Sequence, residues 1–142
     1  MTVQGGYLFD TNILSETWKP KANQGVIEFL RSAEPTSAFI SVLTMGELRK
    51  GVAAKKLRDP DPNAATRLAA WVDGLELSFA DRILGIDTAI AKLWGEWSGE
   101  RPRPVLDTLL AATAVRHDLT LVTRNIRDVR GIPVELLDPW TE

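Results

Sequence analysis

Four acidic residues spread along the sequence are of a type that could form a divalent cation site: Asp10, Glu47, Asp107 and Asp128. If their carboxylates converge, two like charges about 4 Å apart repel by about 4 kcal/mol at an effective dielectric constant of about 20. Such a cluster is strained or partly protonated unless a cation fills it. Because oxygen ligands select hard ions, the expected cofactor is Mg²⁺ or Mn²⁺ and not zinc or copper.

Oxygen-bound Mg²⁺ suits phosphoryl chemistry, because it neutralises phosphate charge and lowers the pKa of a bound water. Thr123 and Asn12 have side chains that could orient a carboxylate or a metal-bound water, although both residue types also commonly cap helices. Basic residues near the acids could hold phosphates, which would give affinity without reading sequence. The basic candidates are Arg49, Arg124 and Arg127.

Composition narrows the classes of protein to consider. With 142 residues, 44% hydrophobic and 25% charged, the chain is expected to form a single globular domain, residues 1–142. It has no cysteine and one histidine, which excludes disulfides, thiolate zinc sites and multi-histidine sites. A net charge of -2 means that any nucleic acid must bind a local basic patch. In the absence of a signal-like start or a long apolar run, we expect a cytoplasmic protein that does not span a membrane.

Short apolar runs predict the strands that position two of the candidate groups. Residues 7–9 form such a run that ends directly before Asp10, and residues 119–123 form another that ends at Thr123. Similar runs predict further strands at residues 38–42, 83–86 and 134–137.

Helical patterns separate these runs. Thr44 stands three residues before Glu47, an arrangement that predicts a capping box and a helix ending near Lys56. The segment 59–63, Asp-Pro-Asp-Pro-Asn, breaks the pattern before a second helical segment, so a helical hairpin is expected there. Residues 105–117 are apolar all round, which predicts a buried helix. The other helical segments are 13–18, 26–31 and 88–97.

Strands that alternate with helices, without hairpin turn signals between them, predict an α/β fold. The expected architecture is a three-layer α/β/α domain with a mainly parallel central sheet of four to five short strands. In such folds the carboxyl ends of the strands form the ligand crevice, so Asp10 and the segment after Thr123 could share one site.

Four segments in order resemble the successive motifs of PIN-domain ribonucleases, and more narrowly the VapC-type toxins of bacterial toxin–antitoxin pairs. Any one motif is weak, but four in sequence with suitable spacing are specific. The segments are Leu8-Phe9-Asp10-Thr11-Asn12, Met45-Gly46-Glu47-Leu48-Arg49-Lys50-Gly51, Asp107-Thr108-Leu109-Leu110-Ala111-Ala112-Thr113-Ala114 and Leu121-Val122-Thr123-Arg124-Asn125-Ile126-Arg127-Asp128.

This resemblance implies a PIN-like fold and Mg²⁺- or Mn²⁺-dependent endoribonuclease activity. It also implies a homodimer, an RNA substrate and a cognate VapB-like antitoxin that blocks the acidic site. Asp10, Glu47 and Asp107 carry over as metal-binding acids by their positions in the motifs. Asp128 is the expected fourth, although some relatives place an acid where this chain has Asn125.

Three other interpretations stay open from the sequence. A catalytically silent module could bind RNA or a protein partner without cleaving it. A haloacid-dehalogenase-like phosphatase could use Asp10 as nucleophile, but those enzymes have a second aspartate where this chain has Asn12. A glycosidase using two carboxylates ranks last, because no cluster of sugar-stacking aromatic residues is apparent.

Overall fold

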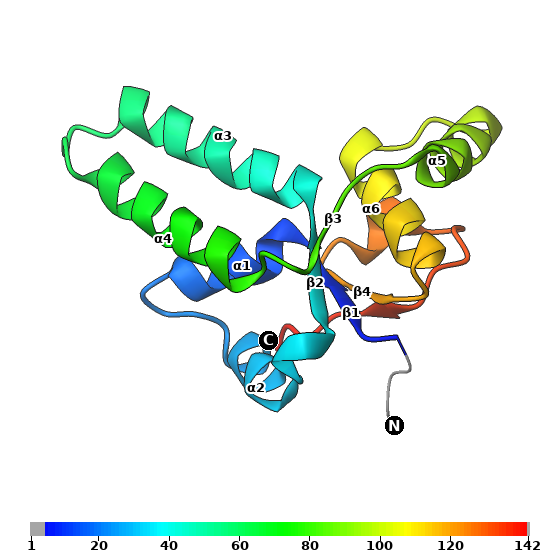
Figure 1. Cartoon of the computed structure of the whole chain (residues 1–142), viewed down its shortest axis with the longest axis horizontal. Helices are drawn as coiled ribbons and strands as arrows, with labels where there is room; N and C mark the ends of the chain where they lie inside the picture. Colours follow the sequence, from blue (N-terminus) through cyan, green and yellow to red (C-terminus); the bar gives the residue numbers. More distant parts are fainter. Residues whose placement is uncertain (1–4, 142) are drawn as a thin grey trace.

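The computed structural model describes residues 5–141, and within them five short strands alternate with six α-helices (Figure 1). The strands are β1 (Tyr7–Phe9), β2 (Ala38–Ser41), β3 (Ile83–Leu84), β4 (Thr120–Val122) and β5 (Leu136–Leu137). The helices are α1 (Thr11–Trp18), α2 (Gln24–Ser32), α3 (Val42–Arg58), α4 (Ala64–Ser78), α5 (Thr88–Glu100) and α6 (Val105–Arg116). Two single-turn 3₁₀ helices are η1 (Pro35–Ser37) and η2 (Ile126–Val129).

All strand pairs are parallel, and the strands lie in the order β3-β2-β1-β4-β5. From β1 the chain builds the sheet outward through β2 and β3, and it then returns to the other side of β1 to add β4 and β5. The strand order therefore reverses between β1 and β4, which is where ligand crevices form in open parallel sheets. The predicted parallel sheet is confirmed, and Asp10 and Thr123 directly follow the two strands at this switch point.

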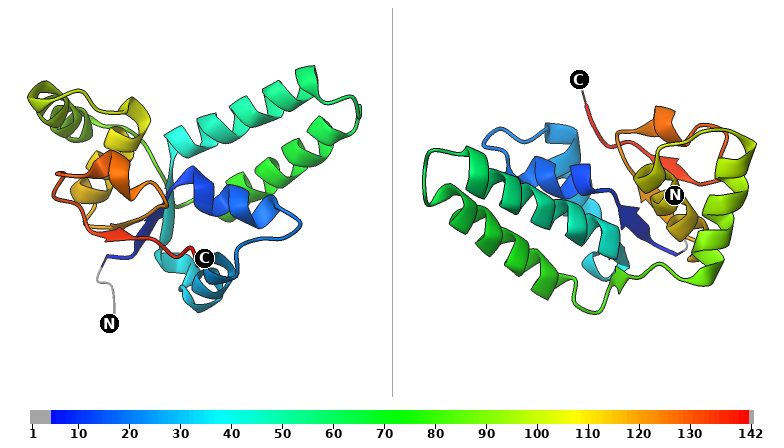
Figure 2. Two further views of the ribbon diagram at one scale, coloured as in Figure 1. Left: turned by 180° about the vertical axis from the view of Figure 1, so that it is seen from behind. Right: turned by 90° about the horizontal axis from the view of Figure 1, so that it is seen from above.

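Alternation of side chains along the strands builds two hydrophobic layers. Leu8 and Leu121 face a core shared with α5 and α6, whereas Phe9 and Val122 face a core shared with α1 to α4. The three views agree that α5 and α6 lie on the opposite side of the sheet from α1 and α2 (Figures 1 and 2). The predicted three-layer α/β/α architecture is thus observed.

Helix α6 is the more deeply buried of the two helices in its layer. Ala111, Ala112 and Ala114 are completely buried, and Leu110 is nearly so. Small alanines let this helix lie close to the sheet, which fits its apolar pattern on all sides. Its first turn reaches the carboxyl ends of the central strands and carries Asp107.

The hairpin of α3 and α4 projects away from the sheet (Figure 1). Its tip is a pair of side-chain-capped turns: the Asp61 N–H donates to Asp59 Oδ1 and the Asn63 N–H donates to Asp61 Oδ1, each at 2.9 Å. Asp59 and Asp61 therefore satisfy backbone groups next to two prolines that donate none. The predicted helical hairpin is confirmed.

The predicted capping box at Thr44 is wrong. Ser41, the last residue of β2, caps α3 instead, because its Oγ accepts the Leu43 N–H at 3.0 Å. The helix therefore begins at Val42, directly after the strand, and Thr44 lies fully buried in its first turn. The helix also continues to Arg58, two residues beyond the predicted end.

The C-terminal segment, residues 138–141, packs on the start of α2. The Asn23 Nδ2 donates to the Thr141 carbonyl at 2.6 Å, and the Thr141 N–H donates to Asn23 Oδ1 at 3.0 Å. A Cβ at Gly25 would lie 2.3 Å from the Pro139 carbonyl oxygen, so only glycine permits this approach. These contacts fix the position of Trp140.

Among residues 5–141, no helix combines the length and hydropathy required to cross a bilayer.

Candidate active site

Asp10 is the innermost of the candidate acids. It follows β1 directly, is 4% exposed, and its N–H donates to the Val122 carbonyl of β4 at 2.9 Å. Asp10 occupies the N-cap position of α1, but its side chain makes no capping hydrogen bond. Its Oδ2 instead accepts the Thr123 hydroxyl at 2.7 Å.

Burial raises the pKa of Asp10 above its ordinary value. The Thr123 hydrogen bond opposes this rise, as do the dipoles of the nearby Thr11 and Asn12 N–H groups, and the charge of Glu47 raises the pKa further. Asp10 is thus a buried carboxylate whose ionised form is supported by only a few dipoles. A cation in front of it would favour the charged form.

Thr123 connects two parts of the site. Besides donating to Asp10, its Oγ1 accepts the Asn125 N–H at 2.9 Å. The side chain is 2% exposed and both hydrogen bonds are short, so the rotamer is fixed. The carboxylate that Thr123 orients is therefore that of Asp10. The backbone N–H of Asn12 lies near the same carboxylate, and Asn12 also lines a separate hollow.

Glu47 is held by a residue that the sequence did not single out. The Thr11 hydroxyl donates to Glu47 Oε1 at 2.6 Å and also lies 3.2 Å from the hydroxyl of the buried Thr44. Thr11 begins α1 and Glu47 lies in α3, so this hydrogen bond ties the acid of one helix to the start of another. In the sequence, Thr11 was marked only by its place in the segment Leu8-Phe9-Asp10-Thr11-Asn12, with no role in the site assigned to it.

Asp107 responds electrostatically to the other three acids. Its pKa is raised from 3.8 to about 6, first by burial and then by the charges of Asp10, Asp128 and Glu47. The nearby side chain of Asn125 opposes the rise. The location of Asp107 in the first turn of α6 is favourable for a negative charge, because the helix dipole is positive there.

Asp128 and Asn125 both belong to the fourth corner of the site. Asp128 lies in η2, where its N–H donates to the Asn125 carbonyl at 3.1 Å, and its charge acts on Asp107. The side chain of Asn125 lowers the pKa of Asp107, and its backbone N–H donates to Thr123 Oγ1. The two residues therefore act on Asp107 in opposite directions, Asp128 by repulsion and Asn125 by favouring the charged form.

The donor set fits a hard divalent cation. All four acids offer oxygen ligands, and a cation would offset both the burial and the repulsion that raise the pKa of Asp107. Within residues 5–141, however, no three acidic or histidine side chains lie close enough together to chelate an ion in their observed rotamers. The carboxylates act on one another through charge, and side-chain rotation would be needed to bring their oxygens together.

The basic candidates lie in different environments. Arg49 pairs with Asp73 at 2.6 Å and Glu76 at 3.1 Å, both on α4, so its charge is compensated within the hairpin. A phosphate contact by Arg49, which stays a prediction, would compete with these exposed ion pairs. Arg124 and Arg127 are exposed and line a hollow of about 560 Å³ that also includes Asn125 and Asp128. These two arginines therefore stand beside the acids.

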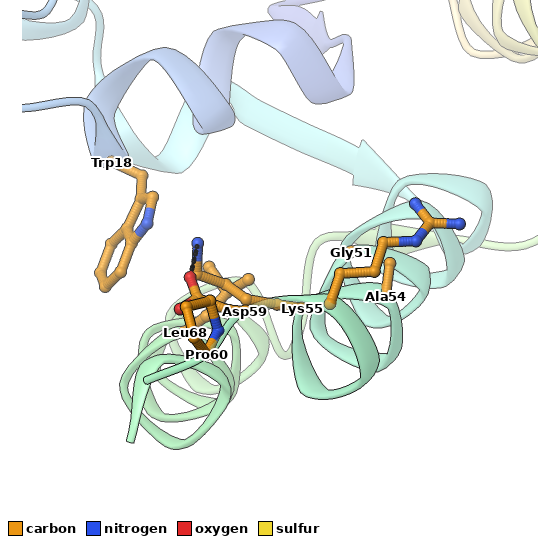
Figure 3. Close-up of a pocket in the computed structure, with 8 residues that line it drawn as sticks. Trp18, Gly51, Ala54, Lys55, Asp59, Pro60 and Leu68 are labelled. Atoms are coloured by element: carbon orange, nitrogen blue, oxygen red, sulfur yellow. Dashed lines mark ion pairs between the residues drawn. The ribbon is translucent and has the colours of Figure 1, made fainter. Parts of the chain in front are cut away.

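A more apolar groove of about 480 Å³ lies elsewhere, between α1 and the hairpin (Figure 3). Trp18 of α1 faces Pro60 and Leu68 across it, and the ion pair of Lys55 and Asp59, at 3.3 Å, lies on its floor. None of the predicted site residues lines this groove.

Fold and site together define an α/β protein with an acidic site at the carboxyl ends of its central strands. The chain belongs to the PIN domain family, whose model matches residues 7–130. The toxin FitB of Neisseria gonorrhoeae is 30% identical over 138 residues, which cover 94% of this chain and 97% of FitB. The VapC ribonuclease Y4jK of Sinorhizobium fredii is 25% identical over 139 residues, covering 94% and 96% of the two chains.

Structural similarity is equally extensive. The crystal structure of FitAcB from Neisseria gonorrhoeae matches with a TM-score of 0.85 and 28% identity, covering 96% of this chain and 99% of the other. The family resemblance inferred from the four motifs is thereby confirmed.

Proposed function

We propose that this protein is a Mg²⁺- or Mn²⁺-dependent endoribonuclease that hydrolyses RNA phosphodiester bonds at the four-carboxylate site. The observation that carries the proposal is the placement of Asp10 at the carboxyl end of β1, where Thr123 from the end of β4 and Thr11 from the start of α1 hold Asp10 and Glu47. Burial, and then the charges of Asp10, Asp128 and Glu47, raise the pKa of Asp107 beside them. A concentration of negative charge beside exposed arginines suits a site that gathers divalent cations next to a phosphate backbone. Similarity to a protein named as a ribonuclease supports the same activity.

In this proposal Asp10, Glu47, Asp107 and Asp128 hold the metal. The ion would neutralise phosphate charge and lower the pKa of an attacking water. The protein's own hydroxyl groups orient the acids: Thr123 holds Asp10 and Thr11 holds Glu47. Asn125 favours the charged form of Asp107, and Arg124 and Arg127 bind phosphates of the RNA backbone.

Single substitutions in the acids test the activity. We expect Asp10→Asn and Asp107→Asn to lower the rate of Mg²⁺-dependent RNA cleavage by at least about 100-fold, because each removes a negative ligand without changing side-chain volume. Asp118→Asn is the matched control, because Asp118 is exposed and its positive φ of 55° is one that asparagine adopts readily. The assay would follow cleavage of cellular RNA with Mg²⁺, Mn²⁺ or EDTA.

Equal activity of wild-type protein and Asp10→Asn would contradict the proposal and favour a silent binding module. A covalent phosphate trapped on Asp10 would favour the phosphatase interpretation instead. Neither outcome is expected, because the side chain of Asp10 is held by Thr123 within a group of like charges.

We further propose that the protein is the toxin of a VapBC-type pair, acts as a homodimer and is inhibited by a VapB-like antitoxin. Similarity to a protein named as a toxin supports this. A basic side chain of the antitoxin would relieve the same carboxylate repulsion that a metal relieves. We expect calorimetry to show Mg²⁺ binding to the free protein and little or none to the complex, and unchanged Mg²⁺ binding in the complex would count against blocking.

A further inference from the structure

A small hollow lies directly beside the acidic site, on the α1 side. It measures about 210 Å³ and is lined by Asn12, Ser15, Glu16, Lys19, Arg124 and Trp140. Arg124 also lines the larger hollow that contains Asn125 and Asp128, so the two hollows adjoin at this arginine. Asn12 is two residues beyond Asp10. The small hollow therefore adjoins the candidate active site through the ends of both β1 and β4.

Arg124 and Trp140 form a cation–π pair in this hollow. The guanidinium carbon lies 5.5 Å from the centre of the Trp140 ring. Trp140 is fixed by its neighbours, since Pro139 and Thr141 pack on Gly25 and Thr141 exchanges hydrogen bonds with Asn23. Arg124 is exposed, and within residues 5–141 no carboxylate forms an ion pair with it.

The acid in the hollow is already compensated. Glu16 accepts from Lys19 Nζ at 3.0 Å and from the Asn23 N–H at 2.8 Å, and these contacts lower its pKa. The carboxylate is ionised and paired with Lys19, so the cation left to attract an anion is Arg124. The hollow thus combines one free guanidinium, an aromatic face beneath it, and the hydrogen-bonding side chains of Asn12 and Ser15.

We infer that this hollow binds one nucleotide of single-stranded RNA, adjacent to the position where the strand is cleaved. Arg124 contacts a phosphate, and the base stacks on the Arg124–Trp140 pair with its edge toward Asn12 and Ser15. The inference rests on the proposed function, because a nuclease acting at the carboxylates must hold the nucleotides next to the scissile bond. It assigns to the C-terminal segment a part in substrate binding.

Binding of an uncleavable RNA tests the inference without depending on catalysis. The probe is a fluorescent 2′-O-methyl oligonucleotide of mixed sequence, and its Kd is measured by anisotropy over a range of KCl concentrations. We expect Trp140→Leu to raise Kd about tenfold and Trp140→Phe to raise it by less than about threefold, because phenylalanine keeps a stacking face. Trp18→Leu, at an exposed tryptophan outside the hollow, is the matched control and should bind as the wild type does.

The arginine is tested independently. We expect Arg124→Gln to weaken binding and to reduce the slope of log Kd against log salt by about 0.7, the value for one phosphate contact on a single strand. Because Arg124 is exposed, we expect the Arg124→Gln protein to fold. It therefore still tests the inference if the Trp140→Leu protein does not fold.

The outcomes separate the two proposals. If the wild-type protein cleaves RNA while the Trp140→Leu and Arg124→Gln proteins bind the probe with wild-type Kd and salt slope, the hollow is not a subsite and the nuclease function stands. If the wild-type protein neither cleaves RNA nor binds the probe, the nuclease function fails and the subsite fails with it.

Discussion

The pKa of Asp107 reports how strongly burial and the neighbouring acids oppose a negative charge in the site. Its pKa is about 6 in the fold against 3.8 for an unperturbed aspartate. The fold therefore favours the neutral form, and the contribution of Asp107 to stability is fully present below about pH 4 and is lost as the pH rises through 6. In metal-free protein at neutral pH, the ionised Asp107 destabilises the folded state.

Replacing Asp107 with asparagine tests whether its charge destabilises the folded state. Because Asp107 is partly exposed, solvent screening reduces the effect, and we expect the variant to be more stable than the wild type by about 1 kcal/mol at pH 7.5 in EDTA. The advantage should shrink as the pH is lowered toward 4, as measured by urea unfolding at several pH values. A difference that does not change with pH would mean that charge repulsion is not its cause.

Thr11 gives a second prediction at this scale. Thr11→Val keeps the shape but removes the hydroxyl that donates to Glu47, whereas Thr11→Ser retains it. Since hydrogen bonds to charged groups contribute about 1.5–3 kcal/mol, we expect Thr11→Val to lower kcat at least about tenfold with little change in KM. Thr11→Ser should stay within about threefold of the wild type. Equal loss in both variants would exclude a positioning role for the hydroxyl.

The acidic residues were easier to predict from the sequence than the residues that hold them in position. Asp10 and Thr123 were predictable because each stands at the end of an apolar run. The carboxyl ends of parallel strands lie at the same edge of the sheet, so such residues come close together. Thr11 was not predictable, because its partner Glu47 is 36 residues away on another helix. The ion pairs of Arg49 were not predictable for a similar reason: its partners on α4 become neighbours only when the hairpin folds.

At the scale of elements, the α3–α4 hairpin has one face in the core and the other in solvent. Leu48 is 6% exposed and packs in the layer that includes Val72, whereas Leu57 on the same helix is 87% exposed. This contrast gives a matched pair of substitutions within one helix.

We expect Leu48→Ala to lower the free energy of unfolding by about 2–4 kcal/mol, because it leaves a cavity in the core. Leu57→Ala should change the free energy of unfolding by less than about 0.5 kcal/mol. Urea midpoints with unchanged m-values would give both numbers. Similar losses at the two positions would contradict the assignment of Leu48 to the core and Leu57 to the solvent face.

Element boundaries were less predictable than element types. The helix after β2 was expected to begin at Thr44 because a capping-box pattern is visible there, yet Ser41 caps it. Either residue could cap by its chemistry, and the choice depends on the length of β2. Strand length in turn depends on pairing with β1 and β3, which no local pattern reports.

At the scale of the whole molecule, the sheet order determines the site. The sequence predicted parallel strands but not the order β3-β2-β1-β4-β5, because each strand is only two to four residues long. The order places β1 in the middle, so that the first strand of the chain pairs with strands formed both early and late. Only this arrangement puts Asp10 next to Thr123.

The hydrogen bond between Asp10 and Thr123 joins residues 113 positions apart, and this separation determines when the site can form during synthesis. A growing polypeptide on the ribosome that already contains Asp10 still lacks β4, Thr123 and Asp128 until that whole intervening length has been added. We therefore expect nascent chains that end before β4 to lack the complete acidic site, because both the carbonyl that accepts the Asp10 N–H and the hydroxyl that holds its carboxylate are still missing.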